Sequence, residues 1–268
     1  MPFVQNAHVT LFVTEAGPAN APAILFSNSL GTTHRMWDAV VAELSSDFRC
    51  IRYDTRGHGA STVSQSPFEI EDLADDALDI LDNLGVKQVH FAGLSLGGMT
   101  GQALALKAPE RLASLTLMAT TAYMPPASAW NDRAALVRRE GTQAIVEATL
   151  QRWFTPGFIT ASKPKVDRIS HEFSNADSEG YAVCCEAIAR MDLRERIKAV
   201  QTPTLIIAGQ QDPATPVAMS VEMNASIAKS LLLVLDPAAH LLAVEQSEAV
   251  VDALRAHING TAQHNRLI

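Results

Sequence analysis

Gly93-Leu94-Ser95-Leu96-Gly97 is the most informative segment of this chain. The apolar residues 89–92 before it predict a buried strand, and residues 99–107 after it favour a helix. A G-x-S-x-G segment between a strand and a helix is typical of a sharp turn with a nucleophilic serine at its apex, where the glycines let the two elements approach closely. The pattern therefore predicts Ser95 as a nucleophile. The alternative is a glycine- and serine-rich turn without chemistry.

A serine is a weak nucleophile unless a base accepts its proton and an acid orients that base. Asp212 follows an apolar run that predicts a strand, and His240 lies in a loop of small residues after the next such run. We predict Asp212 as the orienting acid and His240 as the general base, so that the order along the chain is Ser, Asp, His, each after a strand. Asp236 is the alternative acid, but it precedes His240 by only four positions, from which the outer imidazole nitrogen is awkward to reach.

Acyl transfer also needs N–H donors for the oxyanion that forms on the attacked carbonyl. One donor is normally the amide after the nucleophile, and the other comes from an earlier strand-to-helix loop. The amide of Leu96 is the first predicted donor. The amide of Leu30 is the second, because it lies in the polar loop 27–33 that follows the strand-like residues 23–26.

The order of strand-like and helix-like segments predicts an α/β fold with a mostly parallel central sheet flanked by helices. The two kinds of segment alternate from about residue 20 to residue 120 and again from about residue 200 to residue 258. Between them lie helical stretches at 132–140 and 141–154 with little strand signal, in a region broken up by prolines at 125, 126, 156 and 164. We therefore predict a core formed by residues 1–121 and 200–268, and an inserted all-helical cap, residues 122–199, that covers the cleft.

Composition narrows the range of functions. With 47% hydrophobic and 19% charged residues, the 268-residue chain can bury a large core. A formal net charge of −8 argues against a nucleic-acid partner, and no apolar run is long enough to span a membrane. The N-terminal residues lack the pattern of a signal peptide, so we expect a cytoplasmic protein. The three cysteines are expected to be buried, and no motif predicts a cofactor or a metal site.

Four further phrases carry information beyond the catalytic residues. They are Arg52-Tyr53-Asp54-Thr55-Arg56-Gly57-His58-Gly59, a Gly-rich turn, Ser27-Asn28-Ser29-Leu30-Gly31-Thr32, the loop after the strand-like residues 23–26, and Trp130-Asn131-Asp132-Arg133 and Arg152-Trp153-Phe154-Thr155-Pro156 in the predicted cap. With these phrases and the turn around Ser95, the chain resembles the α/β-hydrolases over essentially its whole length, and among them the 3-oxoadipate enol-lactonases. The turn around Ser95 and the Gly-rich turn are shared across the superfamily, whereas the loop and the two cap phrases are shared by fewer members and indicate the enol-lactonases. We expect the Gly-rich turn to act mainly as scaffold.

The resemblance implies hydrolysis of a small anionic lactone, 3-oxoadipate enol-lactone, through an acyl-enzyme on Ser95 and without a cofactor. Such a substrate carries a carboxylate, which an arginine binds best through two parallel hydrogen bonds. Arg133 is the predicted ligand of this carboxylate, with Arg138 and Arg152 as alternatives, and each could instead be a solvated surface charge. Trp130 and Trp153 are predicted to line the substrate pocket or to pack the cap.

Several alternatives share these motifs. A carboxylesterase, a C–C bond hydrolase or a cofactor-free perhydrolase would use the same catalytic residues on the same scaffold. A ligand receptor that retains the fold and a weak hydrolase site belongs to another class. The sequence is compatible with both a monomer and a homo-oligomer.

Overall fold

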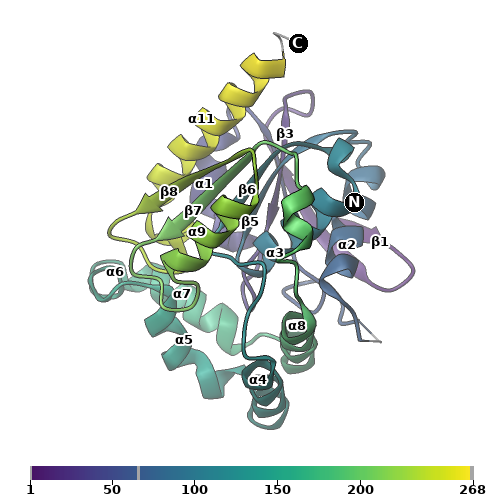
Figure 1. Ribbon diagram of the computed structural model, residues 1–268. Coiled ribbons are helices and arrows are strands. Elements are labelled where there is room, and N and C mark those ends of the chain that lie inside the picture. Colours follow the sequence, from purple (N-terminus) through teal and green to yellow (C-terminus); the bar gives the residue numbers. More distant parts are fainter. Residues whose placement is uncertain (1, 65–66, 266–268) are drawn as a thin grey trace.

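The computed structural model describes residues 2–64 and 67–265, so residues 266–268, at the end of the predicted core, lie outside it. Within the described residues, eight strands form one sheet, which runs through the middle of the molecule (Figure 1). Every neighbouring pair from β4 to β8 is parallel, and β1 and β2 run antiparallel to their neighbours. The order across the sheet is β1 (Phe3–Gln5), β2 (Thr10–Ala16), β4 (Arg49–Tyr53), β3 (Ala23–Ser27), β5 (Val89–Leu94), β6 (Leu112–Met118), β7 (Thr204–Gly209) and β8 (Ser230–Leu235). The predicted α/β fold is confirmed.

Helices flank the sheet because its central strands are apolar on both faces. Every residue of β3 and β7 is buried, as expected of parallel strands that are covered on both sides. Helix α3 is itself buried along most of its length, where it packs on β5 and β6. The helices outside the predicted cap are α1 (Asp38–Leu44), α2 (Ile70–Asn83), α3 (Leu96–Lys107), α9 (Val217–Ser226), α10 (Leu242–Glu245) and α11 (Ser247–Asn265), with 3-10 turns at His34–Trp37, Pro109–Arg111 and Arg196–Ala199.

A group of helices fills the chain between β6 and β7 and gathers beside one end of the sheet (Figure 1). They are α4 (Ala127–Glu140), α5 (Val146–Trp153), α6 (Pro156–Ala161), α7 (Lys163–Ser174) and α8 (Ser178–Arg190), with a 3-10 turn at Thr142–Ile145. The two connections to the sheet lie side by side, because Tyr123 forms an antiparallel bridge with Asp192 and the N–H of Leu193 donates to the carbonyl of Ala122 at 2.8 Å. The predicted cap, 122–199, begins beside this bridge and ends just beyond it. Its status as a separate domain stays a prediction.

Prolines in this region begin helices rather than interrupt them. Pro126 directly precedes α4, and Pro156 occupies the first position of α6. Proline lacks an N–H donor, and the first turn of a helix does not need one. The predicted helix at 132–140 therefore begins earlier, at Ala127, whereas its predicted end before Gly141 is confirmed, since Gly141 has a φ of 79°.

Three expectations from composition can be compared with the fold. Cys50, Cys184 and Cys185 are free and buried, as predicted. Within residues 2–64 and 67–265, no helix combines the length and the apolar character needed to cross a membrane. In the same residues, no group of three or more His, Cys, Asp or Glu side chains is placed to hold a metal ion.

Candidate active site

Ser95 lies between the last residue of β5 and the first residue of α3, in a backbone conformation that is rare for a residue with a side chain. Its φ is 57° and its ψ is −113°. Such a conformation costs free energy and persists only where the surroundings enforce it. Here the N–H of Ser95 donates to the carbonyl of Met118 at 2.9 Å, and its own carbonyl accepts from Thr120 Oγ1 at 2.7 Å. The two bonds fix Ser95 at the apex of the turn.

The glycines around Ser95 are required by close contacts. A Cβ atom on Gly93 would lie 2.1 Å from the carbonyl oxygen of Gly97, and one on Gly97 would lie 2.2 Å from the carbonyl oxygen of Ser27. Both distances are far below a van der Waals contact, and both partners are backbone. The two glycines are therefore required by the close packing of β5, α3 and the end of β3. An ordinary Gly/Ser-rich turn would not need glycine at both positions.

Asp212 and His240 are hydrogen-bonded to each other after neighbouring strands. His240 Nδ1 lies 2.7 Å from Asp212 Oδ2, and both side chains are almost fully buried. The carboxylate also accepts from the hydroxyl of Thr215 at 2.6 Å and from the N–H groups of Ala214 and Thr215 at 2.7 and 3.0 Å. These bonds hold the acid in one orientation, with Nδ1 of His240 bound and Nε2 left for another partner.

The surroundings keep Asp212 ionised. Burial alone would raise the pKa of this carboxyl group, but the electrostatic interaction with His240 and the hydrogen bonds from His240 and Thr215 outweigh burial, so the pKa lies below its ordinary value. The alternative acid, Asp236, is exposed and, in the described part of the chain, forms no hydrogen bond with His240. The pairing seen in the structure is therefore that of Asp212.

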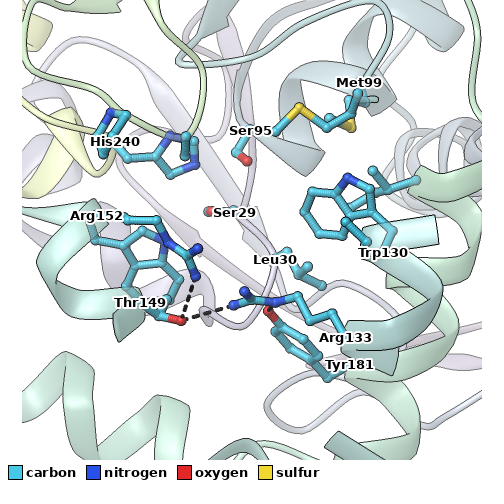
Figure 2. A pocket seen from close by; sticks show the side chains of 16 residues that line it. Ser29, Leu30, Ser95, Met99, Trp130, Arg133, Thr149, Arg152, Tyr181 and His240 are labelled. Carbon is cyan, nitrogen blue, oxygen red and sulfur yellow. Dashed lines mark hydrogen bonds between the residues drawn. The ribbon is translucent and has the colours of Figure 1, made fainter. Parts of the chain in front are cut away.

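Ser95 and His240 line one cavity of about 270 Å³. Figure 2 shows the two side chains at the same end of this cavity. Among the described residues, no hydrogen bond joins Ser95 Oγ to His240. Such contacts are often long in a free enzyme and shorten when substrate binds.

The amide groups of Leu30 and Leu96 are the predicted oxyanion donors. Their neighbours are occupied: Gly31 N–H donates to His58 Nε2 at 2.8 Å, and Gly97 N–H donates to the carbonyl of Asn28 at 2.9 Å. Within the described residues, neither Leu30 N–H nor Leu96 N–H donates to another protein group. The bond between Gly97 and Asn28 also ties the loop of Leu30 to the turn of Ser95.

His58 supports the loop of Leu30, a contact that the sequence did not predict. Burial lowers the pKa of His58, which keeps the imidazole neutral. Its Nδ1 is 3.2 Å from the carbonyl of Arg56, so Nε2 is free to accept from Gly31. The Gly-rich turn thus serves as scaffold, as expected, and in addition fixes one side of the candidate oxyanion site. The motif itself gives no signal for this pairing.

Two arginines occupy the other end of the cavity (Figure 2). Arg133 donates from Nε to the hydroxyl of Tyr181 at 2.7 Å and from Nη2 to the hydroxyl of Thr149 at 2.9 Å. Arg152 reaches the same hydroxyl at 3.5 Å. Burial, and then the charge of Arg133, lower the pKa of Arg152. Neither guanidinium has a carboxylate partner within the described residues, so their positive charge is not neutralised by the protein.

The remaining predicted binding residues divide between cavity and surface. The alternative prediction that Arg138 binds the carboxylate is wrong, because Arg138 pairs with Glu179 and Glu186 and does not line the cavity. Five helical positions separate it from Arg133, which turns it about 140° away around α4. Trp130, three positions before Arg133, lines the cavity. Trp153 also lines it while its ring packs 5.1 Å from that of Phe173, so it both borders the cavity and packs the cap.

Comparisons with known proteins agree with this geometry. A family model described as the alpha/beta hydrolase fold matches residues 22–246. The chain is 43% identical to 3-oxoadipate enol-lactonase 2 of Acinetobacter baylyi, with 92% of both chains covered, and 39% identical to 3-oxoadipate enol-lactonase 1 of the same organism, with 90% of both covered. Among solved structures, it is similar to the enol-lactonase of Burkholderia xenovorans, with a TM-score of 0.93 and 37% identity over 96% of this chain and 100% of that one.

Proposed function

The chain belongs to the α/β-hydrolase family, and from its similarity to 3-oxoadipate enol-lactonases we propose that it hydrolyses 3-oxoadipate enol-lactone to 3-oxoadipate in the catabolism of aromatic compounds. One observation supports this substrate above all others. The cavity that holds Ser95 and His240 also holds two guanidinium groups with no carboxylate partner among the described residues. A lactone with a carboxylate side chain matches both ends of this cavity.

The first chemical step opens the lactone ring. Ser95 Oγ attacks the carbonyl carbon while Nε2 of His240 accepts the hydroxyl proton. Asp212 holds Nδ1 of His240 at 2.7 Å and stabilises the imidazolium that forms. The amides of Leu30 and Leu96 donate to the oxyanion, and the loss of one such donor typically lowers turnover by about 10²- to 10³-fold.

The attack gives a tetrahedral intermediate, and its collapse breaks the ring C–O bond. The leaving oxygen is that of an enol, which carries negative charge better than an alkoxide, and it takes the proton from His240 before the enol becomes a ketone. The acyl group stays on Ser95. A water molecule then gives a proton to His240 and attacks the ester carbonyl, and Ser95 Oγ leaves with that proton. The product has a second carboxylate and the serine is regenerated.

Recognition of the substrate carboxylate is proposed for the arginine end of the cavity. Arg133 is held by two neutral hydroxyl groups, from Tyr181 and Thr149, so its orientation is fixed while its charge remains available to an anion. Arg152 adds a second positive charge beside the same threonine. A neutral ester would leave both charges without a partner in a partly buried site, which favours the lactonase over a carboxylesterase.

The test is steady-state hydrolysis of 3-oxoadipate enol-lactone and of p-nitrophenyl acetate by the wild type and by Ser95→Ala. We expect a kcat/KM for the lactone in the ordinary enzyme range, about 10⁴–10⁸ M⁻¹s⁻¹, well above that for the ester and lost in the variant. The thermal unfolding of Ser95→Ala must match that of the wild type, so that the loss is chemical. Equal or better hydrolysis of the ester would replace the proposal by a general carboxylesterase, and an active Ser95→Ala would refute the mechanism.

A further inference from the structure

The loop that carries His240 is attached to the cap on both sides of the histidine. After His240, the N–H of Leu241 donates to the carbonyl of Trp153 at 2.9 Å. Before it, the N–H of Ala239 donates to Glu245 Oε2 at 2.9 Å. The first bond reaches the cap directly. The second reaches it through Glu245, a half-buried residue at the end of α10.

Glu245 completes the second attachment with its other oxygen. Oε1 accepts from the N–H of Thr155 at 3.2 Å and also from the hydroxyl of Thr155. One carboxylate therefore joins the residue before the histidine to the residue that precedes α6 in the cap. Hydrogen bonds to a carboxylate are stronger than those between neutral groups. The link through Glu245 is therefore well suited to hold the histidine loop in place.

The same short segment of the cap also faces the cavity. Arg152 and Trp153 line it, and Trp153 and Thr155 are the residues bound to the histidine loop. The segment 152–155 thus contacts the cavity with its first two side chains and the histidine loop with the carbonyl of Trp153 and with Thr155. A shift of this segment would be passed to the backbone on either side of His240.

We propose that Glu245 is a positioning residue, which sets the orientation of His240 by anchoring Ala239 to Thr155 of the cap. The inference rests on the proposed function, because it assigns His240 as the base. Glu245 touches neither Ser95 nor the cavity, so it acts only through the backbone of the histidine loop. A displacement of a catalytic group by about 1 Å can cost on the order of 10²-fold in rate, which is the scale on which such an anchor acts.

Two substitutions break the link at different points. Glu245→Gln keeps the shape of the side chain but replaces one accepting oxygen by a donor, so either Ala239 or Thr155 loses its partner. Thr155→Val removes the hydroxyl that donates to Glu245 and leaves the bond from Ala239 to Glu245 in place. The same hydroxyl also accepts from the N–H of Phe158 at the start of α6, so the melting temperature of this variant is measured beside its kcat. We expect each to lower kcat about 10- to 100-fold while KM changes less than about threefold. Thr155→Ser, which restores the hydroxyl, should restore kcat.

A double-mutant cycle and a matched control separate positioning from general stability. Glu245→Gln with Thr155→Val should lose no more than Glu245→Gln alone, because both changes break one link. Glu248→Gln changes an exposed glutamate at the start of α11 and should match the wild type. An unchanged kcat in either single variant, losses that multiply in the double variant, or a lower melting temperature with normal kcat would overturn the inference.

Each kcat is measured with the enol-lactone and with p-nitrophenyl acetate. The ester reports on Ser95 and His240 without depending on the proposed substrate. A wild type that prefers the ester would refute the proposed function, whereas the ester kcat of Glu245→Gln and Thr155→Val would still decide the role of Glu245.

Discussion

Arg133 and Arg138 lie on the same helix but in opposite electrostatic surroundings. Arg138 is paired with two glutamates near the surface, so its charge is already neutralised. Arg133 is bound by the neutral hydroxyl groups of Tyr181 and Thr149, and its guanidinium also lies 5.6 Å from the ring centre of Tyr181. Of these two arginines, Arg133 is the one whose charge is free to attract an anion, since no carboxylate among the described residues pairs with it. The two side chains therefore form a natural pair of test and control.

Arg133→Met should raise KM for the anionic lactone by about 10- to 100-fold, which corresponds to the loss of a charged hydrogen-bonding partner worth about 1.5–3 kcal/mol. Hydrolysis of the neutral p-nitrophenyl acetate should change little. Arg138→Met should leave both substrates unaffected. Steady-state kinetics of the two variants decide the matter, and an unchanged KM for the lactone in Arg133→Met would remove this residue from the binding site.

At this scale the sequence located the groups that carry chemistry but not the groups that hold them. Ser95, Asp212 and His240 each follow a strand, so the strand pattern is enough to place them together at the carboxyl ends of parallel strands. Thr149 and Tyr181 are 16 and 48 positions away from Arg133 along the chain. Their contact depends on how the cap helices pack, and no local pattern of residues encodes that packing.

The geometry of the turn from β5 to α3 depends on two glycines, whose lack of a side chain allows close backbone contacts. Gly97 lies against Ser27, the last residue of β3, and Gly93 lies against Gly97. Because the opposing atoms are backbone, a new methyl group cannot be accommodated by a change of rotamer. The geometry at Ser95 thus depends on residues that have no functional group.

Gly97→Ala should lower the free energy of unfolding by several kcal/mol and abolish hydrolysis, since its Cβ would lie 2.2 Å from the carbonyl oxygen of Ser27. Gly157→Ala is the matched control in α6, where nothing lies within 4 Å of the added atom. This change should leave activity intact and raise stability by up to about 1 kcal/mol, because alanine favours the helix. Urea unfolding and an activity assay measure both effects. Similar stability of the two variants would contradict the steric argument.

Among the elements, buried parallel strands were predictable and the N-terminal antiparallel strands were not. The apolar run predicted as a strand before Asp212 coincides with β7, because such a strand is buried throughout. β1 and β2 gave no comparable signal. β2 alternates between buried and half-exposed residues and contains threonine and glutamate, and β1 has only three residues. The missed strands are the two at one edge of the sheet, and neither is followed by a predicted site residue.

Three histidines, one buried and two half-buried, have surroundings that favour the neutral imidazole. Burial lowers the pKa of His58 and of His257, and burial together with the nearby His257 lowers that of His90 to about 4. In the unfolded chain each group would take up a proton near pH 6.5. Below that pH the unfolded state binds more protons than the folded state, so acidification favours unfolding.

The free energy of unfolding should therefore fall as the pH drops below 6.5, by up to about 1.4 kcal/mol per pH unit for each such histidine. For His90 this loss extends from pH 6.5 down to about 4. His90→Gln should flatten the dependence, while His8→Gln, at an exposed position, should not. Urea unfolding at pH 6.5 and pH 5.5 gives the slopes. An equal slope for the wild type and His90→Gln would show that His90 is protonated alike in both states.

The two attachments of the cap have a consequence for how such proteins can be recombined. At the Tyr123–Asp192 bridge the chain that enters the predicted cap lies beside the chain that leaves it, so the segment between them has the layout of a unit that can be exchanged in one piece. At the far side, however, Trp153 and Thr155 carry part of the support for the loop of His240. A foreign cap would bring its own pocket wall and would also have to recreate that support. Replacing the cap would therefore change the substrate range and the support of the His240 loop at the same time.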